Sequence, residues 1–279
     1  MDIVDSGIRM SKPISIATPP SSIAKDQIKD TRQIRVISDV AAAYSNEEQK
    51  IPRVSLIIPA LNEEKSIGSV LNAIPRELVS EIIVVDNGST DRTADVARHC
   101  GARVVVQPER GYGAACLAGI AEIAPDCEIV AFIDADFSDF PEDMEKLLRP
   151  LLEKKAEMVI GTRTATPEAR LALTPQQRYG NWLATVLVNL FFGYRYTDLG
   201  PFRAIRRDSL EQLGMNDRNY GWTIEMQIKA AKKGLRFVEV PVRYRIRIGR
   251  SKISGTFKGV IFAGTKIIYT IFKYARTGS

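Results

Sequence analysis

The sequence is poor in the features that build disulfide frameworks, metal clusters and membrane spans. It has three cysteines, none in a Cys-x-x-Cys spacing, so we expect reduced thiols in the cytosol and no disulfide or cysteine-bound metal. No run approaches the roughly 18 apolar residues that cross a bilayer, and the N-terminus lacks the apolar core of a secretory signal. We therefore expect a cytoplasmic protein. The single histidine, His99, lies late in a predicted helix, where we expect no general-base role.

Two common nucleotide-binding motifs are also absent. Gly-x-Gly-x-x-Gly does not follow the first predicted strand, and Gly-x-x-x-x-Gly-Lys-Ser/Thr does not occur in the chain. These absences argue against a dinucleotide-binding dehydrogenase and against a P-loop nucleoside triphosphatase. The short sequence Gly111-Tyr112-Gly113 would be weak as a phosphate loop.

Acidic residues are missing from one end of the chain. The segment Val240–Ser279 holds nine basic side chains and no acidic one, whereas the rest carries 30 basic and 33 acidic side chains. The formal net charge of +6 therefore arises in this C-terminal segment. A nearly neutral body with a cationic tail predicts one local anionic partner, such as phosphate, nucleic acid or a membrane surface. The tail has no recognised nucleic-acid motif, so nucleic acid is the least favoured of the three.

What the sequence does contain is an alternation of short apolar runs and helical patterns. The apolar runs predict strands at 54–58, 81–85, 103–106, 129–133 and 158–160, and later at 237–240. The segment 197–205 predicts a loop that leads to a further strand. The periodic segments predict helices at 63–74, 90–100, 113–124, 141–154, 176–194 and 223–233. This alternation predicts an α/β fold with a mostly parallel sheet and helices on both faces. Residues 1–50 show no period, and we expect a partly disordered arm without chemistry there.

Each of the first four predicted strands ends in a polar cluster. Ligands of open α/β sheets bind beyond the carboxyl ends of the strands, so the four clusters should converge on one crevice. The clusters are Pro59–Glu63, Asp86–Asp91, Arg110–Gly113 and Asp134–Asp136. In the last cluster, alternate carboxylates point to different sides of an extended segment. One can accept from a ribose hydroxyl while the other holds a divalent cation, although a solvated acidic turn is the simpler alternative.

Together these motifs resemble the family 2 glycosyltransferases, which have the GT-A fold. The resemblance covers about Pro52–Tyr274 and also includes Gly161-Thr162-Arg163. A narrower similarity to the dolichyl- and polyprenyl-phosphate sugar transferases rests on Asp198–Arg203 and on the stretch Tyr244–Ser254. The resemblance implies a single GT-A domain over 51–255, followed by a basic amphipathic helix and tail over 256–279.

The resemblance also implies a reaction and a set of ligands. We expect an inverting transferase that moves a hexose from a UDP- or GDP-sugar to a polyprenyl or dolichyl phosphate at the cytoplasmic face of a membrane. A soluble enzyme with a small phosphorylated or hydroxyl acceptor is the alternative, and a nucleic-acid-binding protein is a third hypothesis. The metal, Mg²⁺ or Mn²⁺, would be held by Asp134 and Asp136. The residues expected at the donor nucleotide are Pro59, Asn62, Glu63, Asp86, Gly111 and Asp134.

An acceptor phosphate is ionised at neutral pH, so it demands cations more than a base. Guanidinium groups suit bidentate phosphate contacts. The cations expected at phosphate are Arg203, Arg243, Arg245, Arg250 and Lys252. Pro201 stands where some relatives carry a catalytic aspartate, which leaves Asp198 and Glu225 as candidate bases beside a catalytic Arg203. Glu225 is explained equally well as a helix N-terminal acid. Asn87 stands where many relatives have a second aspartate.

Two segments are candidates for lipid contact. At 100° per residue, 256–276 places its apolar side chains on one broad face and Lys258, Lys266 and Lys273 on the other. A basic amphipathic helix of this kind can lie in a membrane interface. The alternative is that the apolar face docks onto the protein body. The apolar helix around 183–192 is the second candidate, with ordinary core packing as its alternative.

Overall fold

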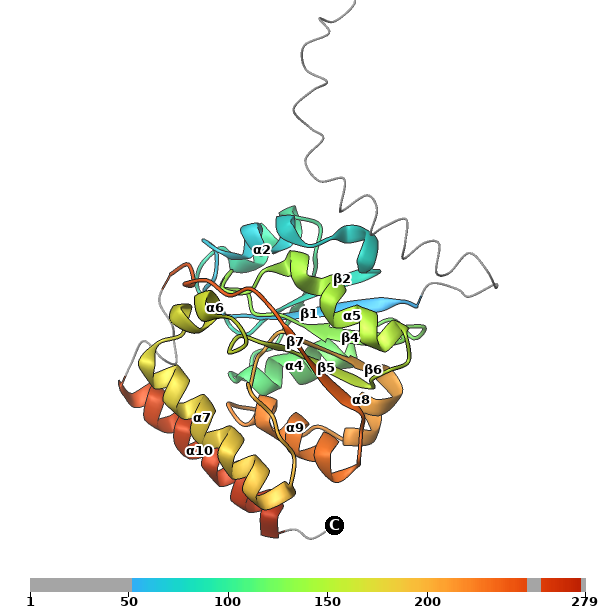
Figure 1. Ribbon diagram of the computed structural model, residues 1–279. Helices are drawn as coiled ribbons and strands as arrows, with labels where there is room; N and C mark the ends of the chain where they lie inside the picture. Colours follow the sequence, from blue (N-terminus) through green and yellow to red (C-terminus); the bar gives the residue numbers. More distant parts are fainter. Residues whose placement is uncertain (1–51, 250–256, 277–279) are drawn as a thin grey trace, which may run out of the picture. The chain divides into compact units, whose positions relative to one another are not determined.

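The structure is a computed structural model that describes residues 52–249 and 257–276 (Figure 1). In the last helix, α10 (Phe257–Arg276), the side chains are described from Phe262 onward. The N-terminal arm expected at 1–50 lies outside the described residues. Two of the cations expected at phosphate, Arg250 and Lys252, also lie outside them.

A mixed sheet forms the centre of the described chain. It has seven strands in the order β3-β2-β1-β4-β6-β5-β7. Strand β6 is antiparallel to its neighbours β4 and β5, and the other paired strands are parallel. The strands are β1 (Val54–Ala60), β2 (Glu81–Asp86), β3 (Arg103–Val106), β4 (Ile129–Phe132), β5 (Met158–Thr162), β6 (Arg203–Arg206) and β7 (Phe237–Pro241). The predicted mostly parallel α/β fold is confirmed.

Helices cover both faces of the sheet, because its central strands are apolar on both sides. In β1, Leu56 and Ile58 belong to one core cluster with side chains of α2, α3 and α5. Ile57 belongs to a second cluster with side chains of α4 and of α7 to α10. The helices are α2 (Ile67–Ala73), α3 (Thr93–His99), α4 (Tyr112–Ala121), α5 (Met144–Leu152), α6 (Pro167–Ala172), α7 (Pro175–Phe192), α8 (Arg207–Leu213) and α9 (Trp222–Lys232). The short 3₁₀ helices η1 (Arg76–Leu78) and η2 (Pro141–Asp143) precede β2 and α5.

The strand predicted after the loop that begins at Thr197 is present as β6, but its antiparallel insertion between β4 and β5 is not predicted by the sequence pattern. Two of the helices are also not predicted. Helices α6 and α8 have six and seven residues, which is too short for a clear helical period. Local patterning therefore misses elements that are stabilised by tertiary packing.

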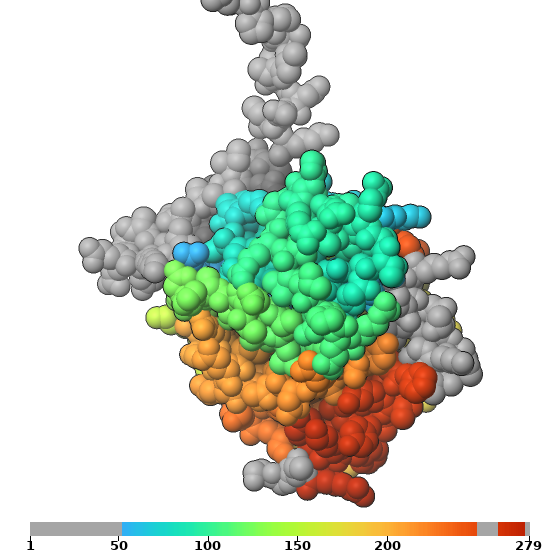
Figure 2. Space-filling view, turned by 180° about the vertical axis from the view of Figure 1, so that it is seen from behind, coloured from blue at the N-terminus to red at the C-terminus, as the bar shows by residue number. Residues whose placement is uncertain are grey.

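The two longest helices, α7 and α10, lie side by side at one end of the molecule (Figure 1). The rings of Phe191 and Phe272 meet there with centroids 5.3 Å apart. Ile271 is fully buried, so α10 docks onto the body through one face (Figure 2). None of the described helices is long and apolar enough to cross a membrane.

Candidate active site

Hydrogen bonds tie together the polar loops that follow β1 and β2. Asn62 has a left-handed backbone, with φ of 52°, which asparagine tolerates better than most residues. Its N–H donates to Ser89 Oγ at 2.9 Å, and its Oδ1 accepts the N–H of Thr90 at 2.7 Å. The N–H of Glu63 donates to Thr93 Oγ1 at 2.8 Å. The two loops therefore form one edge of a shared site.

A cavity of about 340 Å³ lies at this edge of the sheet. It is lined by Asn62, Glu63, Glu64, Lys65, Asp91, Ile248 and Gly249. Asn62 and Glu63 are two of the residues expected at the donor nucleotide, and the cavity brings them together. Pro59, a third, lies within β1 opposite Val85 of β2 and does not line the cavity.

Asp86 and Asn87, at the end of β2, hold neighbouring backbone. Asp86 accepts a backbone N–H of the following turn through Oδ1 at 3.0 Å. Asn87 donates from Nδ2 to the carbonyls of Gln107 and Glu109 at 3.0 and 2.7 Å, and its Oδ1 accepts the N–H of Gly111 at 2.7 Å. A carboxylate has no N–H to donate. The asparagine is therefore matched to its two carbonyl partners.

Asp134 and Asp136 follow β4 directly and form the centre of the site. Asp134 Oδ1 accepts the hydroxyl of Tyr112 at 3.1 Å. Asp136 Oδ1 accepts the N–H of Ser138 at 2.9 Å and its hydroxyl at 2.5 Å. Burial, and then the charge of Asp136, raise the pKa of Asp134 to about 7. The two carboxylates thus differ in their hydrogen-bond partners although they are only two residues apart.

Arg247 brings a positive charge to these carboxylates from the segment after β7. One guanidinium nitrogen lies 2.6 Å from Glu63 Oε1, and another lies 3.2 Å from Asp136 Oδ2. In sequence, Arg247 is only one of nine basic residues in the tail, and nothing distinguishes it from its neighbours. The tertiary structure singles it out as the cation that spans two polar clusters.

The donor set fits a hard divalent cation that arrives with a nucleotide. The guanidinium of Arg247 occupies the position of a shared cation between Glu63 and Asp136. Within residues 52–249 and 257–276, no three His, Cys, Asp or Glu side chains are grouped to hold a metal ion by themselves. Mg²⁺ is commonly bound by one or two carboxylates together with substrate phosphates. Asp134 and Asp136 match that arrangement.

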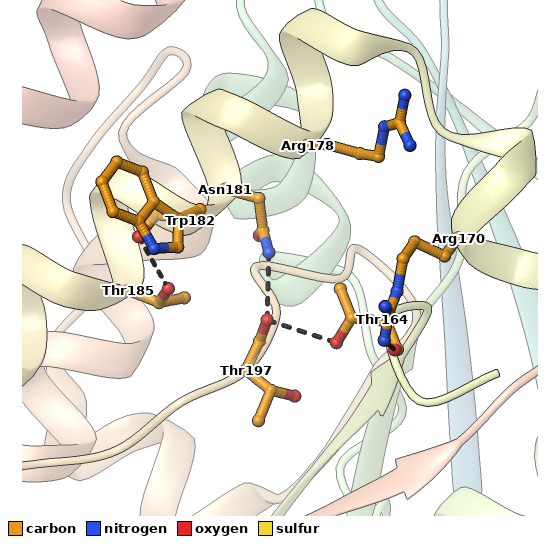
Figure 3. Close-up of a pocket in the computed structure, with 7 residues that line it drawn as sticks. All are labelled: Thr164, Arg170, Arg178, Asn181, Trp182, Thr185 and Thr197. Carbon is orange, nitrogen blue, oxygen red and sulfur yellow. Dashed lines mark hydrogen bonds between the residues drawn. The ribbon is translucent and has the colours of Figure 1, made fainter. Parts of the chain in front are cut away.

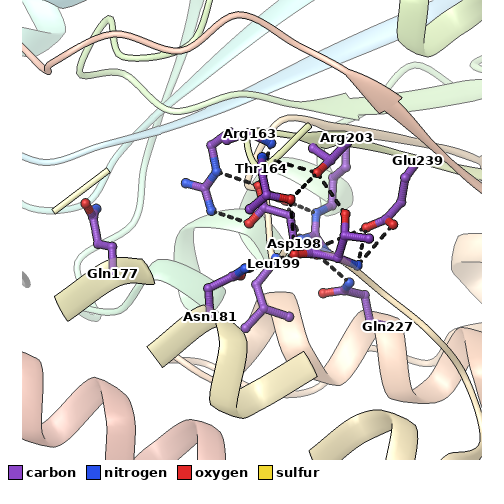
Figure 4. Close-up of polar contacts among 12 residues, drawn as sticks. Arg163, Thr164, Gln177, Asn181, Asp198, Leu199, Arg203, Gln227 and Glu239 are labelled. Atoms are coloured by element: carbon purple, nitrogen blue, oxygen red, sulfur yellow. Dashed lines mark hydrogen bonds and ion pairs between the residues drawn. The ribbon is translucent and has the colours of Figure 1, made fainter. Parts of the chain in front are cut away.

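Asp198, one of the two candidate bases, is fully buried and occupied (Figure 4). It accepts from Arg163 Nε at 2.9 Å, from Nη2 at 2.7 Å and from the Arg163 backbone N–H at 2.7 Å. Its own backbone is held by Gln227 and Glu239. Both carboxylate oxygens of Asp198 are therefore already hydrogen-bonded to Arg163. The geometry favours an anchoring role for Asp198.

Glu225, the other candidate base, is also fully buried. It accepts the N–H of Asp217 at 2.7 Å and the hydroxyl of Tyr274 in α10 at 2.7 Å, and it lies 2.8 Å from Lys229 Nζ. These contacts connect the start of α9 with the preceding loop and with α10. The geometry again favours anchoring, and Glu225 also lies in the first turn of α9, as the alternative of a helix N-terminal acid expects.

Arg203 is buried and bound to backbone. Its Nε donates to the carbonyl of Gly200 at 3.0 Å and its Nη1 to that of Thr223 at 3.1 Å. Burial lowers the pKa of Arg203 from its ordinary value. With 1% of its surface exposed, Arg203 is not open to a phosphate in this conformation.

Arg243 and Arg245 are likewise engaged with the protein. Arg243 forms an ion pair with Asp143 at 2.9 Å. Arg245 Nε donates to the carbonyl of Phe137 at 2.6 Å, and its guanidinium lies 4.0 Å from the ring centre of Phe140. Both residues therefore hold the segment after Asp136 rather than present a free guanidinium to a ligand.

A second cavity, of about 410 Å³, lies beside α7 (Figure 3). It is lined by Thr164, Arg170, Arg178, Asn181, Trp182, Thr185 and Thr197. The lining contains two guanidinium groups, three hydroxyls and no carboxylate. Arg170 Nη2 donates to the Thr164 carbonyl at 2.7 Å. A signal for this cavity exists in the sequence, because no Asp or Glu occurs between Glu168 and Asp198.

The second cavity is connected to the buried pair of Arg163 and Asp198. Asn181 of α7 donates to the carbonyl of Thr197 at 3.0 Å (Figure 3), and it accepts the N–H of Leu199 at 2.8 Å. The hydroxyl of Thr197 lies 2.9 Å from that of Thr162 at the end of β5. The cavity wall is thus continuous with the end of the sheet.

The sheet topology, the paired carboxylates after β4 and the cavity at the ends of β1 and β2 define a GT-A-type nucleotide-sugar transferase. The model of the family "Glycosyl transferase family 2" matches residues 55–214. The chain belongs to this family and is a nucleotide-sugar-dependent glycosyltransferase.

Several relatives align with this chain over most of their own length. An uncharacterized glycosyltransferase of Mycobacterium tuberculosis is 41% identical over 211 residues, which are 75% of this chain and 94% of the relative. A dolichyl-phosphate hexose transferase of Haloferax volcanii is 33% identical, over 77% of this chain and 92% of its own length. An undecaprenyl-phosphate mannosyltransferase of Micrococcus luteus is 30% identical, over 74% and 90% respectively.

Solved structures show the same fold. Glucosyl-3-phosphoglycerate synthase from Mycobacterium tuberculosis, in complex with Mn²⁺ and UDP-glucose, superposes with a TM-score of 0.66 and 26% identity, over 87% of this chain and 84% of that one. The same enzyme in complex with Mn²⁺, UDP and phosphoglyceric acid gives a TM-score of 0.68 and 24% identity over the same shares. The predicted GT-A fold is confirmed by these neighbours.

Proposed function

We propose that the protein transfers a hexose from a nucleoside diphosphate sugar to the phosphate of a polyprenyl phosphate, at the cytoplasmic surface of a membrane. The observation that carries the proposal is the position of the second cavity. One of its two lining arginines, Arg178, shares helix α7 with a row of exposed apolar side chains. A phosphorylated lipid has an anionic phosphate and an apolar chain, so its binding site needs cations and apolar side chains close together.

The donor would bind where the polar loops converge. Asn62 and Glu63 would line the nucleoside cavity, and Asp134 and Asp136 would hold Mg²⁺ or Mn²⁺ together with the donor diphosphate. A divalent cation there would neutralise the charge that develops on the leaving diphosphate. The glucosyl-3-phosphoglycerate synthase structures, which contain Mn²⁺ or Mg²⁺ with UDP, support this assignment.

The acceptor phosphate would enter the second cavity. The Arg178 guanidinium lines this cavity and has no hydrogen-bond or ion-pair partner among the described residues, although the backbone N–H of Arg178 donates to the Thr174 carbonyl. Its guanidinium can therefore bind an oxyanion without breaking an existing contact. A phosphate monoester is ionised at neutral pH and serves as its own nucleophile, so the reaction needs no strong base. A reaction without a strong base is consistent with the carboxylates of Asp198 and Glu225, which are already bound by other protein groups.

The apolar side chains beside this cavity would contact lipid. On α7, Tyr179, Trp182 and Leu190 are 64%, 57% and 72% exposed. On the adjacent α10, Phe262 and Tyr269 are 66% and 59% exposed. Neither helix contains an acidic residue, and α10 carries lysines and an arginine. Exposed apolar area with basic side chains and no acidic ones suits an anionic membrane surface.

A small phosphorylated acceptor is the second candidate. It is favoured by the structural similarity to glucosyl-3-phosphoglycerate synthase, which was solved with phosphoglyceric acid. Such an acceptor would use the cationic cavity but not the exposed apolar row. The two candidates therefore differ in their dependence on a lipid surface.

A transfer assay separates the candidates. Wild-type protein is supplied with UDP- and GDP-hexoses and Mn²⁺, with undecaprenyl phosphate in vesicles or with 3-phosphoglycerate in solution. We expect transfer to the lipid phosphate, and Arg178→Gln should lower kcat/KM for that acceptor about 10- to 100-fold, because a charged hydrogen bond to phosphate is lost. Arg195→Gln, an exposed arginine of the neighbouring segment that does not line the cavity, is the matched control.

Two outcomes would count against the proposal. Transfer to 3-phosphoglycerate without transfer to the lipid would establish the second candidate. Equal activity of the Arg178 and Arg195 variants on the lipid acceptor would remove the second cavity from the acceptor site.

A further inference from the structure

We infer that Tyr112 is a positioning residue that orients Asp134 for the cation and diphosphate of the donor. The inference rests on the proposed function, because that function makes Asp134 a ligand of the donor's metal. It assigns a specific role to the Gly-Tyr-Gly sequence, which is a weak candidate for a phosphate loop.

The contact itself is simple. The Tyr112 hydroxyl donates to Asp134 Oδ1 at 3.1 Å, from the first residue of α4. A phenol has an ordinary pKa of about 10, so at neutral pH the Tyr112 hydroxyl keeps its proton and can donate. A hydrogen bond to one oxygen fixes the plane of a carboxylate and directs its other oxygen. Such a donor stabilises the negative charge of Asp134, which the nearby charge of Asp136 disfavours.

Two glycines place the backbone of Tyr112 where this contact is possible. A Cβ at Gly111 would lie 2.1 Å from the carbonyl oxygen of Arg218, and one at Gly113 would lie 1.9 Å from that of Asp217. Both distances are far below van der Waals contact, so only glycine permits the approach. The approach allows the Ala114 N–H to donate to the Arg218 carbonyl at 2.8 Å. The glycines therefore serve close packing against the loop at 217–219.

The other side of Tyr112 is held by the end of β2. The N–H of Gly111 donates to Asn87 Oδ1 at 2.7 Å, and Asn87 is fixed by its two carbonyl partners. The start of α4 is thus clamped between β2 and the loop at 217–219. A clamp on both sides restricts the position of the phenol ring.

The loop at 217–219 is fixed in turn by α9 and α10. Glu225 accepts the Asp217 N–H at 2.7 Å, and Lys266 Nζ of α10 lies 2.9 Å from Asp217 Oδ2. A continuous set of contacts therefore runs from α10 through this loop to Tyr112 and Asp134. A tyrosine that served only core packing would need no hydroxyl contact with a site carboxylate.

The test uses Tyr112→Phe in the full chain, which keeps the ring and removes only the hydroxyl. Tyr196→Phe is the matched control, since its buried hydroxyl donates to the Gln227 carbonyl at 3.0 Å, away from the two aspartates. The dissociation constant of Mn²⁺ with UDP, or with GDP if the wild type prefers it, is measured by calorimetry, alongside the unfolding midpoint. We expect Tyr112→Phe to weaken Mn²⁺–nucleotide binding about tenfold, as is usual when a partner of a metal ligand is lost. Tyr196→Phe should leave this constant within about twofold while losing similar stability.

The outcomes separate the inference from the proposed function. If the wild type binds Mn²⁺–nucleotide and Tyr112→Phe binds it equally well, the positioning role is overturned and the proposed function stands. If the wild type binds no Mn²⁺–nucleotide, both are overturned. A loss of stability in Tyr112→Phe without a change in the dissociation constant assigns the hydroxyl to packing alone and also overturns the inference.

Discussion

At the scale of single residues, polar side chains near the site are distinguished by what already binds them. Arg203, Arg243 and Arg245 are held by carbonyls, a carboxylate or aromatic rings, whereas Arg178 keeps its guanidinium available. From residue type alone, Arg203, Arg243 and Arg245 are equally suited to bind a phosphate. The hydrogen-bond partners decide which of them can serve a ligand.

Asn87 provides a first prediction at this scale. Asn87→Asp removes the N–H groups that bind the carbonyls of Gln107 and Glu109, and it sets a negative charge beside both oxygens. We expect the free energy of unfolding to fall by about 2 kcal/mol, the usual cost of leaving buried groups unsatisfied. Urea unfolding measures it. Asn72→Asp, at an exposed position of α2, is the control. Equal stability of the Asn87 variant and the wild type would contradict the assigned contacts.

Asp134 gives a prediction about pH. Its folded pKa is about 7, above the ordinary 3.8, so the native state holds a proton between about pH 4 and 7 that the unfolded chain has lost. Stability contributed by this group is therefore lost as the pH rises through that window. Asp134→Asn cannot ionise, and its unfolding midpoint relative to wild type should rise by roughly 5–10 °C between pH 5 and 8 without divalent cation.

The control for this pH effect is Asp95→Asn, because the Asp95 side chain is 76% exposed. Its midpoint relative to wild type should stay constant between the two pH values. A pH-independent difference for Asp134→Asn as well would show that its pKa is not raised.

At the scale of elements, α7 combines two surfaces. Asn181 and Arg178 face the second cavity, while Leu190 is exposed near the partner helix α10. The sequence of α10 is compatible with lipid contact and with docking onto the body, and the structure shows the helix docked through Ile271 with Phe262 exposed. Helix α10 can therefore dock onto the body through one face and contact lipid through another.

The exposed row predicts the behaviour of the helices on vesicles. Leu190→Asp combined with Phe262→Asp should reduce binding to anionic vesicles about tenfold or more, since each side chain would lose roughly 1.5–3 kcal/mol of apolar burial and gain a like charge. Co-sedimentation measures it. Val106→Asp is the control, because Val106 is equally apolar and 61% exposed on β3, away from these helices. Unchanged vesicle binding by the double variant would refute lipid contact at this face.

At the scale of the whole molecule, α10 is an integral part of the fold. Ile271 belongs to the core cluster beneath the sheet, and Tyr274 and Lys266 contact the loop and helix beside α4. Ile271→Ala should lower the free energy of unfolding by about 2–5 kcal/mol, the range for emptying a buried aliphatic site. Ile246→Ala, at an 80% exposed position, should change it by less than about 0.5 kcal/mol. Equal urea midpoints for the two variants would show that α10 is not docked.

The periodicity of apolar residues determines which parts of this fold can be predicted from the sequence. The strands from Val54 to Val159 and the long helices are recovered because burial imposes a period of two or 3.6 residues on contiguous sequence. The sequence predicts a strand after the loop at 197–202, but not its antiparallel position between β4 and β5, because that position depends on partners elsewhere in the chain. The same holds at the site, where Arg247 meets Glu63 across 184 residues of sequence.

The sequence by itself determined the fold class, the family and the meeting of polar clusters at the ends of β1, β2 and β4, because strand ends follow directly from the pattern of strands. Only the tertiary structure decided the uses of the charged residues. It bound Asp198 and Glu225 in buried contacts, left the guanidinium of Arg178 in α7 without a protein partner, and placed the Tyr112 hydroxyl on Asp134. The reason is physical: a charged side chain can bind a ligand only if other protein groups do not already bind it, and folding alone decides which distant groups lie close to it.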